Sequence, residues 1–181
     1  EAAHSNQPYE RYLLALLEAE VNHREVNSER KRIAQARFPV LKALDEFRFA
    51  DIPSLNRQAI LELAQGNYIQ AKENIVFLGP TGTGKTHLAI SLGLAACRQG
   101  RRVRFATAAG LINELMEAQA QLRLSKVEAA LLKLDLLILD EVGFVPFSKP
   151  GAELLFGLLT DRYERGSVLV TTNLDCASWT E

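Results

Sequence analysis

The sequence has few cysteines and no long apolar run, and each shortage excludes a class of protein. Cys97 and Cys176 lie far apart, with no C-x-x-C pattern and no histidine cluster beside them, so we expect neither a disulfide framework nor a zinc site. No apolar stretch approaches the roughly 18 residues of a membrane-spanning helix, and we expect no membrane partner. There is no initial Met and no signal-peptide pattern. We therefore expect a reduced, cytoplasmic protein, of which this chain is a piece.

The composition is ordinary for a soluble globular protein, with 48% hydrophobic and 24% charged residues. The 181 residues have room for one full domain and a smaller appendage. A net charge of −1 hides two basic clusters, which are typical of a solvated helix face and also of a surface that contacts nucleic-acid phosphates. Both interpretations stay open. The first cluster is Arg24, Arg30, Lys31, Arg32 and Arg37, and the second is Arg98, Arg101, Arg102 and Arg104.

The first part of the chain predicts a helical unit. An apolar stripe at four-residue spacing predicts a helix over residues 9–37, and two prolines then interrupt the pattern. We place a domain boundary within residues 38–54. The expected division is a small helical N-terminal domain with its linker over residues 1–50 and a second domain over residues 51–181. The stripe consists of Leu13, Leu17 and Val21, and the prolines are Pro39 and Pro53.

The second part of the chain alternates between apolar strands and helices. This alternation predicts an α/β fold in which helices cover both faces of a parallel sheet. Ser125 and Glu128 have the spacing of a capping box at the start of one helix. The predicted strands are residues 74–79, 101–107, 135–141 and 167–173; the predicted helices include residues 54–66, 111–122 and 125–134, a helix ending at Gly100 and one from Pro150 to Gly166.

Residues 79–89, GPTGTGKTHLA, follow a predicted strand and open a predicted helix. Gly79, Gly84, Lys85 and Thr86 fill the pattern G-x-x-x-x-G-K-[ST] in the context that its mechanism requires. The glycines allow the backbone to wrap around phosphates, whose charge meets the N–H groups and dipole of the helix. Lys85 would reach the outer phosphates, and the Thr86 hydroxyl would bind Mg²⁺. The loop predicts binding of a nucleoside triphosphate.

Two polar strand ends indicate hydrolysis as well as binding. Asp140 and Glu141 end the third predicted strand, where an aspartate can hold hydrated Mg²⁺ and the next glutamate can activate a water. A small-molecule kinase has no use for that glutamate, because its nucleophile is the acceptor substrate. Asn173 ends the fourth strand and could orient the water if the two strands are neighbours; a turn-starting asparagine is the alternative. The pattern favours an ATPase.

Four stretches, GPTGTGKTHLA, DLLILDEVGFVPF, LLFGLLTDRYERGS and TTNLDCASW, resemble the IstB family of transposition-helper ATPases, close kin of DnaC-type helicase loaders in the AAA+ class. The resemblance covers nearly the whole chain and includes Trp179, six residues after Asn173. It implies ATP and Mg²⁺, an ATP-dependent oligomer on double-stranded DNA, and a partner transposase that the ATPase regulates in DNA transposition. The site residues that it implies are Gly79, Pro80, Thr81, Gly82, Thr83, Gly84, Lys85, Thr86 and His87 for the nucleotide, Thr86 and Asp140 for the metal, and Lys85, Glu141 and Asn173 for catalysis.

The resemblance also implies that the C-terminal part of the AAA+ module is missing. In this family the arginine finger and sensor 2 lie beyond the asparagine, and the chain ends eight residues after Asn173. Arg162 and Arg165 precede Asn173 and do not match the finger. Phe47 and Phe49 are candidates for contact with adenine, with core packing as the alternative. A DnaC-like replicative helicase loader and a nucleotide-sensing regulator without motor activity are the alternative functions.

Overall fold

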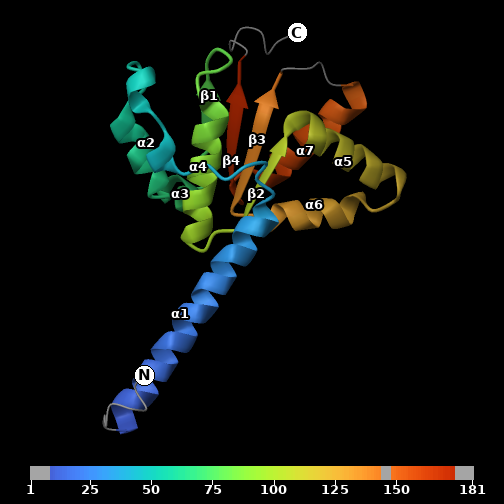
Figure 1. Cartoon of the computed structure of the whole chain (residues 1–181). Coiled ribbons are helices and arrows are strands. Elements are labelled where there is room, and N and C mark those ends of the chain that lie inside the picture. The colour runs from blue at the N-terminus through green and yellow to red at the C-terminus, as the bar shows by residue number, and fades with distance from the viewer. Residues whose placement is uncertain (1–8, 144–147, 174–181) are drawn as a thin grey trace.

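The computed structural model, which describes residues 9–143 and 148–173, is built on one sheet of four parallel strands. Their spatial order is β1-β4-β3-β2, so β3 and β4 are hydrogen-bonded neighbours (Figure 1). Because all pairs are parallel, the carboxyl ends of the strands meet at one edge of the sheet. The strands are β1 (Ile75–Leu78), β2 (Val103–Thr107), β3 (Leu136–Val142) and β4 (Ser167–Thr172).

Helices cover both faces of the sheet, and this confirms the predicted fold class (Figure 1). On one face α4 (Lys85–Arg98) packs against β3 and β4, flanked by α2 (Arg57–Ala64) and α3 (Asn67–Ala71). On the other face lie α5 (Ala108–Ala120), α6 (Leu124–Leu132) and α7 (Lys149–Arg162). The central strand β3 is buried from both sides, which explains its continuous apolar sequence.

Two local predictions were wrong and one helix was missed. The capping box fails because α6 begins at Leu124 and Ser125 already lies inside the helix, where its hydroxyl cannot act as the N-cap. Helix α5 begins earlier than predicted, since the Thr107 hydroxyl accepts a hydrogen bond from Gly110 N at 3.1 Å and caps it there. The short helix α3 was not predicted; it follows Gly66, whose left-handed φ of 78° breaks the chain direction after α2.

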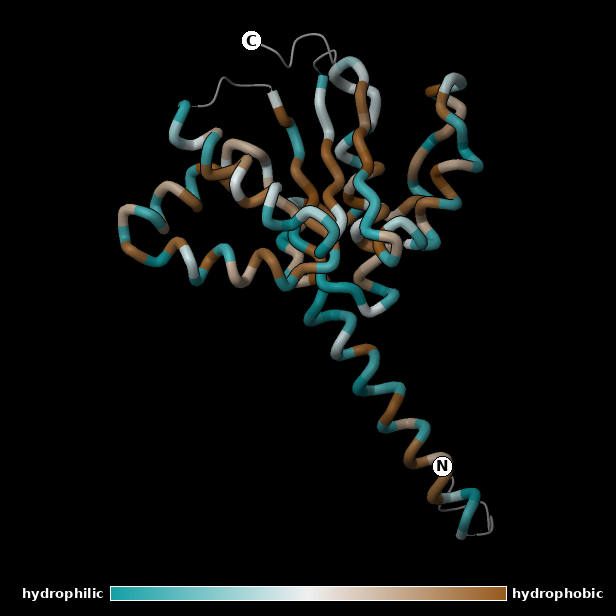
Figure 2. Tube along the Cα trace, turned by 180° about the vertical axis from the view of Figure 1, so that it is seen from behind, coloured by the Kyte–Doolittle hydropathy of each residue, from teal (hydrophilic) through white to brown (hydrophobic). Residues whose placement is uncertain are grey.

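Helix α1 (Tyr9–Ala36) projects away from the body, and its C-terminal end joins the core through the buried Ala36 (Figures 1 and 2). Arg32 fixes this end, since its Nε donates to the Cys97 carbonyl at 2.8 Å. The predicted apolar stripe does not pack into the described core: Leu13, Leu17 and Val21 are all more than half exposed. Within the described ranges, neither α1 nor another helix is long and apolar enough to cross a bilayer.

The segment between α1 and α2 crosses α4 close to its N-terminus. The Ser91 hydroxyl donates to the Lys42 carbonyl at 3.0 Å, and two short 3₁₀ turns (Leu44–Glu46 and Phe49–Asp51) follow. Phe47 is buried between them and packs with Ile60 and Leu88. The linker therefore lies against α4, the helix that directly follows the phosphate loop. The division at residues 50 and 51 stays a prediction.

Candidate nucleotide-binding site

The phosphate loop joins β1 to α4 at the carboxyl edge of the sheet. Gly84 is the N-cap of α4 and has a left-handed φ of 78°. A Cβ atom at Gly84 would lie 2.7 Å from Phe47 Cε2, so this position requires glycine both for its conformation and for the close approach of the linker. The N-terminal N–H groups of α4 consequently face the loop, which favours an anion there.

Lys85 is the first residue of α4, and its side chain folds back over the loop. Its Nζ donates to the carbonyls of Gly79 and Pro80, each at 2.7 Å. The Thr83 hydroxyl also donates to the Pro80 carbonyl, at 2.8 Å. An ammonium has three donors, so two hold the loop in shape while the third is left for a phosphate oxygen. These contacts place the charge of Lys85 over the anion-binding face of the loop.

Thr86 and Asp140 come together from α4 and β3. The Thr86 hydroxyl lies 3.0 Å from both carboxylate oxygens of Asp140, and the Thr171 hydroxyl donates to the same carboxylate. Asp140 is only 4% exposed, and no Lys or Arg pairs with it in the described part of the chain. A buried carboxylate that has only hydroxyl partners favours a cation beside it. Hydroxyl and carboxylate oxygens are the ligands that Mg²⁺ prefers, so the residues fit this metal.

A bulge in β3 turns Glu141 toward the same edge. The register with β4 pairs Leu139 with Val170 and then Val142 with Thr172, which leaves two residues of β3 opposite one of β4. Glu141 has a left-handed φ of 60°, and its N–H donates to the Thr171 hydroxyl at 3.0 Å. The side chain is consequently exposed instead of alternating into the core. Asp140 and Glu141 therefore both lie at the edge of the sheet that carries the phosphate loop, although they are consecutive.

One cavity of about 320 Å³ collects most of the predicted residues. Asn173, which directly follows β4, lines it together with Glu141, so the condition that β3 and β4 be neighbours is met. Sequence reasoning missed Lys42 as a member of this lining. The polar end of β4 was a signal for Thr171, but no sequence pattern pointed to Lys42. The lining residues are Lys42, Thr81, Gly82, Gly84, Lys85, Thr86, His87, Glu141, Thr171, Thr172 and Asn173.

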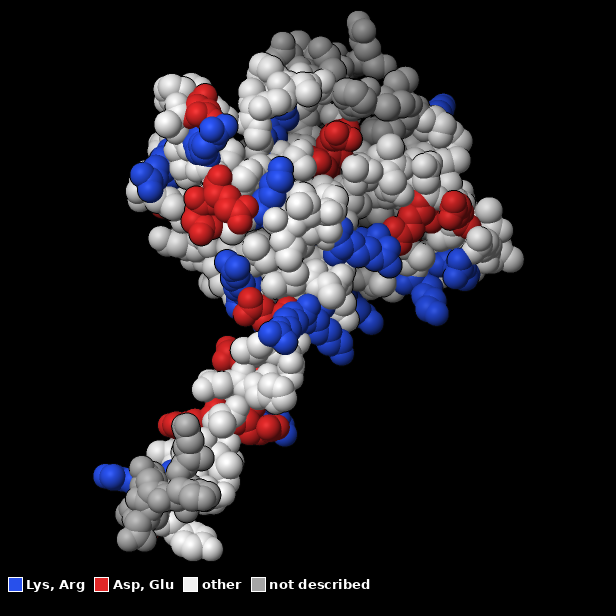
Figure 3. All heavy atoms as spheres, viewed as in Figure 1, with Lys and Arg blue, Asp and Glu red and all other residues white. Residues whose placement is uncertain are grey.

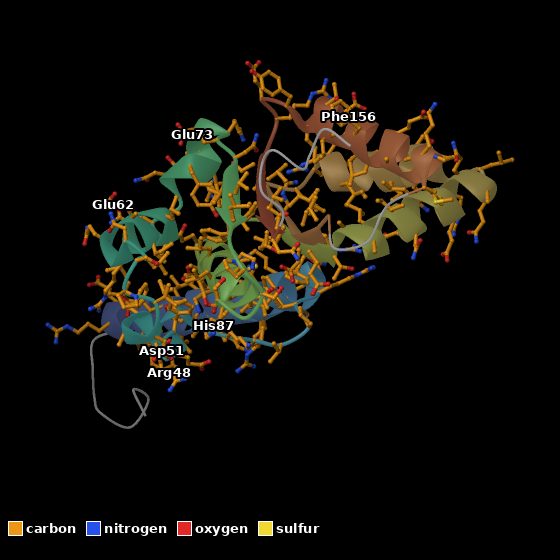
Figure 4. The ribbon with its side chains drawn as sticks, turned by 90° about the horizontal axis from the view of Figure 1, so that it is seen from above. Arg48, Asp51, Glu62, Glu73, His87 and Phe156 are labelled. Carbon is orange, nitrogen blue, oxygen red and sulfur yellow. The ribbon has the colours of Figure 1, made fainter. Side chains whose placement is uncertain are left out.

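His87 and Phe47 form the border between this cavity and the linker. In Figure 4 His87 lies beside the turn that carries Arg48 and Asp51. Its Nε2 lies 3.1 Å from the Ala43 carbonyl, and its ring meets Phe47 edge-on at 5.2 Å between centroids. Phe47 packs in turn against Phe49, so the packing alternative accounts for both aromatic rings. Phe47 also lines a second hollow on the outer side of Gly82 and Gly84, which is where a base could lie.

Arg162 and Arg165 lie close to β4 but do not line the candidate site. Arg165 is exposed. Arg162 is 1% exposed and donates to the carbonyls of Leu131, Leu134 and Ser167, at the edge of the sheet opposite to the phosphate loop. Burial lowers the pKa of Arg162 to about 10, so it stays a cation at neutral pH.

Pro8, Cys176 and Trp179 lie outside the described residues, as do residues 144–147.

The chain belongs to the family described as IstB-like ATP binding protein, whose model matches residues 1–181. It is 39% identical over 181 residues to a protein of Pseudomonas aeruginosa named as an ATP-binding protein of insertion sequence IS21. This match covers 100% of this chain and 68% of that protein. It is 37% identical over 180 residues to the corresponding protein of insertion sequence IS5376 from Geobacillus stearothermophilus, covering 99% of this chain and 72% of the relative.

Solved structures share the fold. The AMPPCP-bound DnaA from Aquifex aeolicus has a TM-score of 0.65 and 22% identity over 73% of this chain and 42% of that one. The DnaC helicase loader has a TM-score of 0.58 and 25% identity over 67% of this chain and 71% of that one. Both likenesses agree with the predicted AAA+ type of parallel-sheet core.

Proposed function

We propose that this chain is the nucleotide-binding part of an ATP-hydrolysing, DNA-binding helper of transposition, which assembles on target DNA in its ATP form and regulates a partner transposase. The family and the names of its insertion-sequence relatives support the link to transposition. The observation that carries the enzymatic part is the single cavity in which a phosphate loop meets Glu141 and Asn173.

The arrangement of these side chains supports hydrolysis. The loop backbone and Lys85 would bind the β- and γ-phosphates, and Thr86 and Asp140 would hold Mg²⁺, which supplies positive charge at the phosphate oxygens when bound. Glu141, turned into the cavity by the bulge, takes the proton of a water aligned with the γ-phosphate. Asn173 is the polar group that orients this water from the end of β4.

The Lys85→Ala variant of the full-length protein tests the nucleotide site. We expect it to lose tight ATP binding and, with it, ATP-dependent assembly on DNA, because this ammonium is the main point charge on the outer phosphates. Equilibrium binding of a labelled nucleotide measures the first effect and sedimentation with duplex DNA measures the second. Wild-type nucleotide affinity in this variant would contradict the assignment of the loop.

A basic groove where α1 meets the body is the proposed contact with DNA phosphates. Figure 3 shows Lys and Arg side chains gathered at this junction. The cavity there measures about 470 Å³, and seven of its lining residues are cations against a single acidic residue, Glu114. Several basic side chains of the two sequence clusters are already paired: Arg24 with Glu20, Arg98 with Glu29, Arg102 with Asp135 and Arg104 with Glu114. The groove cations are Arg32, Arg37, Arg102, Arg104, Arg123, Lys126 and Lys133.

A salt titration on duplex DNA tests the groove. The side chains of Lys126 and Lys133 are exposed and have no hydrogen bond or ion pair to another described residue, so we expect their replacement by Glu to leave the fold unaffected. If both contact phosphates, the slope of log affinity against log salt falls by about 1.8 in magnitude, and sequences are affected alike. The matched control is Lys72→Glu with Lys149→Glu, two exposed lysines that do not line the groove. Parallel lines for wild type and the groove variant would exclude this surface.

A replicative helicase loader is the second candidate function, because the DnaC helicase loader shares the fold at 25% identity. The two functions differ in the partner and not in the ATPase chemistry. Capture of purified transposase by the ATP-bound full-length protein supports the transposition helper. Capture of a purified helicase ring without capture of the transposase supports the loader.

A further inference from the structure

A lysine from outside the phosphate loop reaches the nucleotide cavity. Lys42 belongs to the linker that follows α1, yet it lines the cavity together with Lys85, Glu141 and Asn173. We propose that the Lys42 ammonium is a second phosphate-binding cation, which contacts the γ-phosphate of bound ATP and so couples the nucleotide to the linker and α1. The proposal rests on the proposed function in that the phosphate loop must bind ATP.

The backbone of Lys42 is held in a fixed position relative to the loop. The Ser91 hydroxyl shares its proton between the Lys42 carbonyl at 3.0 Å and the His87 carbonyl at 2.9 Å. His87 Nε2 donates to the Ala43 carbonyl at 3.1 Å, since a carbonyl can only accept. His87 and Ser91 lie one turn apart on α4, the helix that begins with Lys85. The linker is thus attached at two successive residues to the element that carries the phosphate-binding lysine.

The side chain of Lys42, by contrast, has no other assignment. In residues 9–143 and 148–173 its ammonium makes no hydrogen bond and no ion pair. Lys85 already donates to two loop carbonyls, so its ammonium has one donor left for a phosphate oxygen. Of the described residues that line the cavity, Lys42 and Lys85 are the cations and none is an arginine.

The chemistry of the cavity calls for a second cation. Glu141 lines it, and Asp140 lies behind Thr86, so the protein itself brings two carboxylates to the phosphate edge. Phosphoryl transfer is accelerated by positive groups on the γ-phosphate oxygens, where charge develops. A lysine that enters from the linker side meets those oxygens without displacing Lys85 from the loop.

The contact distinguishes ATP from ADP. ADP lacks the γ-phosphate, so Lys42 stabilises the ATP complex and leaves the ADP complex almost unchanged. A ligand shifts a conformational equilibrium only by its differential interaction with the two states, and the Lys42 contact supplies such a difference to the linker. Ala36, the buried end of α1, precedes Lys42 by six residues, so only a short segment separates the proposed Lys42 contact from the end of α1.

Equilibrium binding to the full-length protein tests this role, with Mg²⁺ and either a non-hydrolysable ATP analogue or ADP. We expect Lys42→Ala to weaken the ATP analogue about tenfold and ADP less than about twofold, since a hydrogen bond between charged groups is lost only with ATP. Lys42→Arg should retain most of the preference for the ATP analogue. The control Lys149→Ala, an exposed lysine at the start of α7, should change neither affinity. Matching thermal unfolding curves establish that each variant is folded.

Two outcomes overturn the role of Lys42 and are separable from failure of the nucleotide site. An unchanged ratio of ATP-analogue to ADP affinity in Lys42→Ala excludes the γ-phosphate contact, whereas unchanged affinity in Lys85→Ala removes the nucleotide site itself. Hydrogen exchange gives the second readout: the ATP analogue should protect residues 30–44 in the wild type and not in Lys42→Ala. Equal protection in both proteins excludes the coupling to α1.

Discussion

Replacement of Arg162 by Met tests whether this arginine stabilises the fold or takes part in ATP hydrolysis. Arg162 is the largest fully buried side chain of the described core, at 1% exposure. Its guanidinium donates to Leu131 O at 2.5 Å, Ser167 O at 3.1 Å and Leu134 O at 3.3 Å, and so joins α6 to the start of β4. Met has a similar length and no donor, so the substitution removes these three bonds with little change in volume.

The expected loss of stability follows from the three carbonyls. Each buried carbonyl that loses its partner costs about 1 kcal/mol net, which gives a decrease of about 3 kcal/mol in the free energy of unfolding. Burial of the guanidinium charge is itself unfavourable, which is why it lowers the pKa of Arg162. Removal of this charge therefore offsets part of the loss. For a protein of this size, about 3 kcal/mol corresponds to a decrease in Tm of roughly 6–12 °C.

Thermal unfolding followed by circular dichroism measures the effect on the full-length protein, with and without MgATP. The matched control is Arg165→Met, because Arg165 is exposed and its side chain has no hydrogen bond or ion pair in the described chain. We expect its free energy of unfolding to change by no more than about 0.5 kcal/mol. A normal Tm with lost ATPase turnover in Arg162→Met would refute the structural role and make Arg162 a functional cation.

Two further predictions concern the acidic strand end and the buried thiol. Glu141→Gln should lower ATP turnover by about 10²-fold or more while ATP binding persists, because the base is lost and the loop is intact; loss of binding in a nucleotide titration would indicate a metal or structural role instead. Burial raises the pKa of the Cys97 thiol to about 11, with Arg32 acting in the opposite direction. Iodoacetamide at pH 8.5 should therefore modify Cys97 at least about 100-fold more slowly in the native than in the unfolded protein, as mass spectrometry of its peptide reports. Because the folded pKa exceeds the unfolded value, the contribution of Cys97 to stability holds below about pH 8.5 and is lost as the pH rises through 11.

The sheet and the phosphate loop could be predicted because their signals are local. The strands are short and mostly apolar, and the central strand β3 begins with four consecutive apolar residues, as a parallel sheet buried on both faces requires. The loop pattern needs only one strand, one helix and fixed spacing, all of which are contiguous in sequence. The structure brings Thr86 and Asp140 together for a related reason, since parallel strands bring their carboxyl ends to one edge; their role as metal ligands stays a prediction. The structure places them 3.0 Å apart although 54 positions separate them in sequence.

Lys42 could not be predicted because its position depends on where the linker crosses α4. That crossing is fixed by contacts of Ser91 and His87 with backbone carbonyls, and a carbonyl leaves no signature in the sequence. The apolar stripe of α1 correctly predicted a helix but not the surroundings of that helix. Periodicity states which residues share a face of the helix, but it does not state what that face contacts. Leu13 and Leu17 share a face, and in the described structure that face is exposed.

Backbone strain gives a separate indication that the end of β3 is a functional site. Among the described residues, five non-glycine residues adopt a left-handed φ. Four of them lie one or two residues past the end of a helix, where this conformation ends the helical turn: Arg37, Lys72, Leu122 and Glu164. Glu141 is different, because it lies inside a strand and its φ of 60° ends no helix. This conformation costs about 1–2 kcal/mol for a residue with a side chain, and glycine would avoid that cost. A glycine, however, has no carboxylate to direct into the cavity. The strain is thus understandable as the consequence of placing a buried aspartate that contacts Thr86 and an exposed glutamate at consecutive positions of one strand.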